Sequence, residues 1–161
     1  MITILFTESE LEKFAISLKS LVMNEKIQLA LSMFQKSKNI LYIRADGDGI
    51  IGIIKSQTKE ELDYSICIDS KRYFCGTQNI RVCGSLRGGI CKHILLGLIA
   101  SVKSGVLDQK KALDLIVSVS KSGPIYDRSK AKSIFEEYEH YKSGTIDWRP
   151  IEIFPEDLLA F

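Results

Sequence analysis

Cysteine and histidine side chains gather in one part of this 161-residue chain, between Cys67 and His93. Cys91 and His93 stand one residue apart, shortly after two glycines and at the start of the apolar, helix-like stretch CKHILLGLIASVKSG. Thiolate sulfur and imidazole nitrogen are ligands that zinc prefers, and structural zinc sites use four of them. Because the regular rotation of the helix has not yet begun at its first residues, the side chains of Cys91 and His93 can both face one ion. The sequence therefore predicts a zinc site that includes Cys91 and His93.

The other two zinc ligands must come from the remaining cysteines, at positions 67, 75 and 83. Other uses of the cysteines stay open, among them a disulfide such as Cys75 with Cys83, or thiols that bind nothing. A nucleophilic pair of Cys91 with His93 is disfavoured, because residues two apart on a helix do not face each other. No third group that would orient such a pair is evident.

The arrangement of strands, cysteines and helix resembles the SWIM-type zinc finger. That family's pattern is Cys-x-Cys, a variable loop and then Cys-x-His, carried by a short antiparallel sheet and the helix after it. The resemblance covers about residues 39–102 and is closest in the sequence CKHIL, which starts at Cys91. It implies bound Zn²⁺ and assigns four ligands, namely Cys75, Cys83, Cys91 and His93.

The opening half of the motif departs from the family pattern, because this chain has no Cys-x-Cys. Arg81 stands where the closely spaced pattern requires a cysteine, so Cys75 takes the place of the first ligand in an expanded variant. Cys67 is the alternative to Cys75. It lies within the alternating sequence YSICID, where a buried cysteine acts as a small hydrophobic residue.

The elements expected around these ligands form an α+β fold. Helical spacing to about residue 37 predicts one long N-terminal helix or two short ones, and alternation after Asn39 predicts a small antiparallel sheet with a glycine-containing hairpin turn. C-terminal helices are expected up to Gly105, after Asp108, and from Ser129 to Gly144. The expected divisions are an N-terminal helical segment (1–38), a SWIM-like zinc-binding sheet and helix (39–105), C-terminal helices (106–144) and an apolar, acidic tail (145–161).

Composition limits the broad class of protein. The chain is 45% hydrophobic and 26% charged, with a formal net charge of +2, which is ordinary for a globular protein. The N-terminal sequence lacks the basic leader and the long apolar region of a signal peptide. No apolar run approaches the roughly 20 residues that cross a bilayer. We expect a cytoplasmic protein.

Basic residues around the predicted zinc site indicate contact with nucleic acid, and we expect DNA. No acidic residue lies among the five basic ones between positions 71 and 93, which are Lys71, Arg72, Arg81, Arg87 and Lys92. These side chains can contact phosphates, although some of them can instead offset the charge of the thiolates. Of Tyr73 and Phe74, strand alternation points one into the core and leaves the other to stack on a base.

A protein partner is the second expectation, and the two are compatible. The resemblance to SWIM-type fingers implies recombinational repair beside a RecA-family paralogue. The tail carries large apolar residues that either pack back on the domain or bind a partner, among them Trp148, Phe154 and Leu158. The alternative is a pure protein–protein adaptor that uses the N-terminal helix and this tail, with the basic residues incidental. Since no phosphate loop or paired carboxylates are evident, we do not expect an enzyme.

Overall fold

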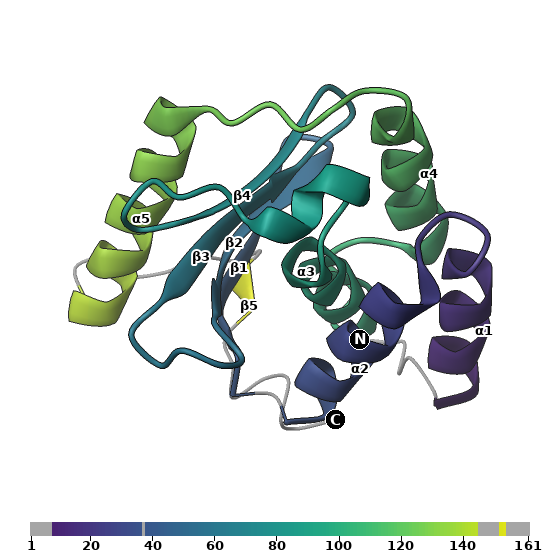
Figure 1. The fold of residues 1–161 in the computed structure, drawn as a ribbon. Helices are drawn as coiled ribbons and strands as arrows, with labels where there is room; N and C mark the ends of the chain where they lie inside the picture. Colours follow the sequence, from purple (N-terminus) through teal and green to yellow (C-terminus); the bar gives the residue numbers. More distant parts are fainter. Residues whose placement is uncertain (1–7, 37, 145–151, 154–161) are drawn as a thin grey trace.

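The computed structural model describes residues 8–36, 38–144 and 152–153, and side chains of all of these except 8, 9, 87, 152 and 153. The element order confirms the α+β prediction (Figure 1). In chain order the elements are α1 (Glu8–Leu18), α2 (Asn24–Lys36), β1 (Ile40–Asp46), β2 (Gly49–Lys55), β3 (Asp63–Ile68), β4 (Tyr73–Thr77), the short 3₁₀ helix η1 (Gly84–Gly88), α3 (Lys92–Lys103), α4 (Gln109–Ser120), α5 (Arg128–Ser143) and β5 (Glu152–Ile153).

Local chemistry explains where these elements begin and end. The β1–β2 hairpin turns at Gly47, whose φ of 61° is the left-handed conformation that glycine adopts without strain. The Asp108 side chain caps α4 by accepting a hydrogen bond from the Lys111 backbone N–H at 2.8 Å. The helix expected from Ser129 begins at Arg128, because Asp127 is the residue that caps it.

The sheet is antiparallel, with strand order β4-β3-β2-β1-β5. It is covered on both faces (Figure 1). On one face α3 packs against the sheet, with α1, α2 and α4 beyond it, and this side holds the larger apolar cluster. On the other face α5 covers a smaller cluster that includes Tyr42, Cys67 and Phe74. The fold is therefore three layers, helix, sheet and helices.

Double coverage corrects the expectation for Tyr73 and Phe74. Both rings are buried, with exposures of 3% and 0%, because one faces the α3 side and the other the α5 side. Neither ring can stack on a nucleic-acid base in this fold.

The outer edge of β4 is covered by backbone from later in the chain. The carbonyl oxygen of Tyr73 accepts from the N–H of Ile125 at 3.0 Å, and that of Cys75 accepts from the N–H of Cys83 at 2.9 Å. A covered edge cannot pair with a strand of another chain. Among the described helices, none combines the length and the apolar character that crossing a bilayer requires.

Candidate metal centre

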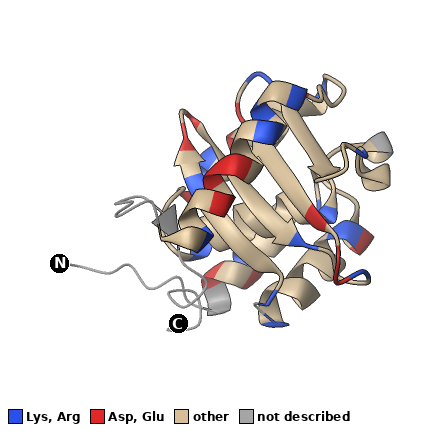
Figure 2. Ribbon diagram, turned by 90° about the vertical axis from the view of Figure 1, so that its left-hand side faces the viewer, with Lys and Arg blue, Asp and Glu red and all other residues tan. Residues whose placement is uncertain are grey.

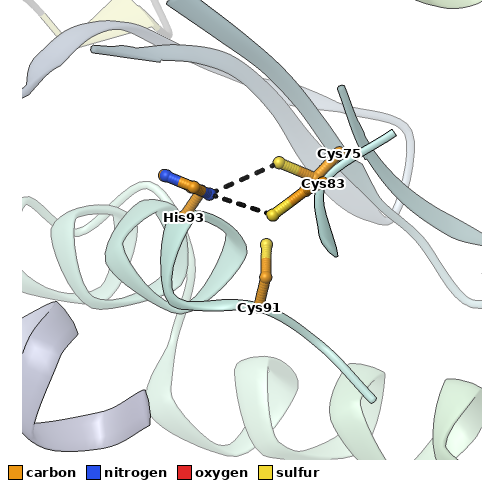
Figure 3. A group of neighbouring side chains, drawn as sticks. All are labelled: Cys75, Cys83, Cys91 and His93. Carbon is orange, nitrogen blue, oxygen red and sulfur yellow. Dashed lines mark hydrogen bonds between the residues drawn. The ribbon is translucent and has the colours of Figure 1, made fainter. Parts of the chain in front are cut away.

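Four side chains from different elements converge between the sheet and the start of α3 (Figure 3). Cys75 lies within β4, Cys83 directly precedes η1, Cys91 directly precedes α3, and His93 is the second residue of α3. Their ligand atoms all lie within 4.8 Å of one another, and all four residues are buried. These are the four residues that the resemblance assigned.

The distances in this cluster fit a tetrahedral metal ion. The Nδ1 atom of His93 lies 3.6 Å from the Cys75 sulfur and 3.5 Å from the Cys83 sulfur. Zinc bound tetrahedrally to sulfur at ~2.3 Å and to nitrogen at ~2.05 Å holds those two ligand atoms about 3.6 Å apart. The cluster is therefore of the right size and composition for one such ion.

Strand register decides between Cys75 and Cys67. Cys75 pairs with Ile66 across the β3–β4 ladder, so both side chains point to the α3 side. Cys67 pairs with Phe74 and points to the opposite face, toward α5. The sheet thus separates Cys67 from the cluster. None of the chain's four cysteines, all within the described residues, is in a disulfide, so the alternative pairing of Cys75 with Cys83 is wrong.

The backbone between the ligands explains the wide cysteine spacing. After β4 the chain turns back at residues 77–81 and runs beside β4, which places Cys83 next to Cys75. A 3₁₀ turn follows, and Gly89, with a φ of 111°, redirects the chain toward Cys91. The backbone therefore brings Cys75 and Cys83 together although seven residues separate them, whereas in a Cys-x-Cys motif one residue separates the two cysteines.

Burial keeps two of the three cluster cysteines protonated unless a cation is bound. Burial raises the pKa of Cys91 to about 12 and that of Cys75 well above its usual range. Hydrogen bonds from those two thiols lower the pKa of Cys83. By themselves the three sulfurs therefore favour one thiolate held by two thiols. Three thiolates can coexist here once a divalent cation balances their charge, and metal binding then releases protons.

Two further residues support the site, and sequence reasoning missed both. The ring of Tyr64 stacks on the imidazole of His93, with centroids 4.1 Å apart and planes inclined by 18°. The ammonium group of Lys26, on α2, donates to the carbonyl oxygens of Ser85 at 2.9 Å and Ile90 at 3.0 Å. Nothing local in the sequence marks Lys26, because its two acceptors lie 59 and 64 residues away.

The four predicted nucleic-acid residues whose side chains the structure describes are spread over different elements. Lys71 and Arg81 are exposed, but they follow β3 and β4 respectively and so lie beyond opposite ends of β4. Arg72 is paired with Asp127 at 2.6 Å, and Lys92 donates to the side chain of Gln57 at 3.2 Å.

Four of the predicted contact residues involve parts of the chain that the structure does not describe. The side chain of Arg87 lies outside the described part of the chain, as do Trp148, Phe154 and Leu158. Within the tail, β5 is described, and it pairs with β1 through Ile153 opposite Ile43.

Comparison of the sequence with protein-family profiles and with curated proteins, and of the fold with solved structures, finds no match. The Cys₃His cluster therefore stands on its own geometry.

Proposed function

We propose that this protein is a non-catalytic binding module whose fold is held together by one zinc ion. The observation that carries the proposal is the cluster of three cysteine sulfurs and the Nδ1 atom of His93, with N–S distances of 3.5 and 3.6 Å. The ion would join β4 and its return segment to the start of α3. Its binding free energy would then be part of the folding free energy.

Burial of the cluster supports a structural rather than a catalytic ion. Cys75 and Cys91 are 0% exposed, and His93 is 3% exposed. Catalytic zinc usually has three protein ligands and leaves the fourth position to water or substrate. Four protein ligands here would fill the coordination shell.

Metal analysis of cysteine variants tests this proposal, and Cys67 supplies a matched control. We expect one zinc ion per purified chain, retained in Cys67→Ala and lost in Cys83→Ser and Cys91→Ser. Both classes of variant remove a buried sulfur, but the sheet separates Cys67 from the cluster. Zinc loss in Cys67→Ala equal to that in Cys91→Ser, or a wild-type protein that binds no zinc, would contradict the proposal.

A protein is the partner that the surface favours. Exposed apolar side chains occur on the segment between Cys75 and Cys83, at Ile80 and Val82, and on the N-terminal helices, at Ile16 and Leu29. The resemblance to SWIM-type fingers suggests a RecA-family recombinase paralogue as the partner, with a role in DNA repair. Co-elution of the purified chain with such a paralogue tests that assignment, and separate elution at micromolar concentrations would refute it.

DNA is the second candidate partner, supported by the exposed cations Lys71 and Arg81. Contacts to phosphates make affinity fall as salt rises. We therefore expect DNA affinity, measured by fluorescence anisotropy, to fall with salt and to be lost in Lys71→Glu with Arg81→Glu. Binding that neither salt nor these substitutions weaken would exclude this mode. In a pure adaptor, the alternative function, the wild-type chain would bind no DNA at low salt.

A further inference from the structure

A groove lies between α5 and the backbone that turns back after β4. It has a volume of about 560 Å³, and its lining includes Thr77, Gln78 and Ile80 from the turn, Tyr126 from the segment before α5, and Ala131 and Phe135 from α5. We call this cavity the edge groove. It lies on the opposite face of the sheet from the cysteine cluster, because α5 forms one of its walls.

Exposed apolar side chains continue the groove along the edge of β4. Ile80, Val82 and Ile125 are 52%, 51% and 54% exposed. Val82 pairs with Gly76, and a side chain at Gly76 would contact the ring of Tyr126, so Val82 points to the Tyr126 side of the sheet. Ile80 lines the groove and Val82 points to the same side of the sheet, so these two side chains extend the groove surface. Adjoining apolar groups of this kind mark interaction sites more often than isolated ones do.

The backbone holds Ile80 in an unusual conformation. Its φ is 63°, in the left-handed region, where a β-branched residue is an outlier. Two backbone hydrogen bonds fix the turn. The N–H of Thr77 donates to the carbonyl oxygen of Arg81 at 2.9 Å, and the N–H of Ile80 donates to the carbonyl oxygen of Thr77 at 3.0 Å. A strained residue that presents an apolar side chain to solvent is typical of a functional surface.

Cations border the edge groove on the α5 side. Arg128 and Lys132 both line it, whereas Glu139 is the one acidic residue of the lining. Figure 2, which views the molecule from the α5 side, shows basic residues gathered over one end of the helix nearest the viewer and acidic residues following them. Among the described residues, no carboxylate lies within ion-pair distance of Arg128. Lys132 lies 3.9 Å from Glu136 in an exposed pair, of a kind that contributes little. An occupant with carboxylates would therefore find Arg128 and Lys132 beside the apolar surface.

We propose that the edge groove, with Ile80 and Val82, is the docking surface for a protein segment that carries a bulky apolar side chain flanked by carboxylates. The apolar side chain enters the groove between Tyr126 and Phe135, and the carboxylates pair with Arg128 and Lys132. This inference rests on the proposed binding-module function, since it names that module's partner chemistry. It also links docking to zinc, because Cys75 and Cys83 hold the start and the end of the turn that forms one wall.

Selection from a library of short random peptides, using the zinc-loaded full-length chain as the target, tests the inference. We expect enriched peptides to place Phe, Leu or Trp beside Asp or Glu, and to shift the amide resonances of residues 77–82 and 126–135. Ile80→Asn should weaken their binding about 10-fold or more, as expected for a central apolar contact. Asparagine tolerates the left-handed backbone, so this variant should fold. Arg128→Glu should weaken binding more strongly at low salt than at high salt.

Val117→Asn is the matched control, since Val117 is 49% exposed but lies on α4. Its affinity should equal that of the wild type. The groove assignment would be wrong if selected peptides bound Ile80→Asn and the wild type with equal affinity, or shifted only the amide resonances of α1 and α2. Neither result would contradict the proposed zinc-bound module. Failure of the wild-type chain to hold zinc would instead overturn the proposed function. If a synthetic peptide of residues 152–161 binds the groove and no library peptide does, the occupant is the chain's own tail and the assignment to a partner protein is wrong.

Discussion

Replacing Lys26 by methionine should weaken zinc binding without unfolding the protein. The Lys26 ammonium group, which comes from α2, holds the segment between Cys83 and Cys91 through the carbonyl oxygens of Ser85 and Ile90. Methionine keeps the length and apolar character of the side chain and is a good helix former, but it cannot donate. The substitution therefore removes two hydrogen bonds and leaves α2 in place.

The expected loss follows from the two contacts. A hydrogen bond from a charged group contributes about 1.5–3 kcal/mol, and the bond to Ser85 is solvent-exposed and so counts for less. We take about 2 kcal/mol for the pair. If this segment is ordered mainly in the zinc-bound state, the whole amount enters the metal affinity. At 1.4 kcal/mol for each factor of ten, zinc affinity should fall by about 30-fold.

Competition for zinc with a chromophoric chelator measures this change. Lys36→Met is the control, because it makes the same substitution at an exposed position in the last turn of the same helix. Its zinc affinity should stay within about twofold of wild type. Equal affinities in the two variants would refute the positioning role of Lys26. So would a Lys26→Met protein whose stability falls equally with and without zinc, since Lys26 would then support the fold and not the site.

Three further outcomes are expected. Gly52→Ala should lower the free energy of unfolding, measured in urea, by about 2 kcal/mol or more, because the new Cβ would lie 2.5 Å from a carbonyl oxygen of β1. Tyr64→Leu should weaken zinc binding about two- to tenfold through loss of stacking on His93, whereas Tyr64→Phe should not. Partial burial is the largest single effect on the pKa of Asp46 and raises it, but the hydrogen bonds and charges of Lys130 and Arg44 together outweigh burial, and the net pKa is lowered. Asp46 therefore stabilises the fold above the unfolded pKa of about 3.9, and this contribution is lost as pH falls through the folded pKa. The free energy of unfolding of the wild type should thus fall more between about pH 5 and pH 2 than that of Asp46→Asn, and parallel curves for the two proteins would contradict this.

Local patterns in the sequence determined the types of element, several of their ends and the chemistry of the cluster. The hairpin turn at Gly47 and the cap at Asp108 depend on residues only a few positions apart, so they could be predicted from the sequence. The same holds for Cys91 and His93, whose closeness follows from their separation by one residue. Cysteine and histidine in one segment indicated a soft divalent metal before any distance was known.

Tertiary structure decided which cysteine completes the cluster and whether Tyr73 or Phe74 is exposed to stack on a base. Strand register turned Cys75 toward α3 and Cys67 toward α5. Helices cover both faces of the sheet, so α3 and its neighbours bury Tyr73 and α5 buries Phe74, whereas the sequence analysis allowed for one buried face. Neither result follows from local pattern, because register and layer order are set by contacts between residues far apart in the chain.

Long-range pairing also settled the roles of charged residues. Arg72 is balanced by Asp127, 55 residues away, and Lys26 reaches carbonyl oxygens that belong to the metal-binding segment. A charge in a sequence shows only that a side chain needs water or a partner. Which of the two it finds depends on what the fold places within about 3 Å of it.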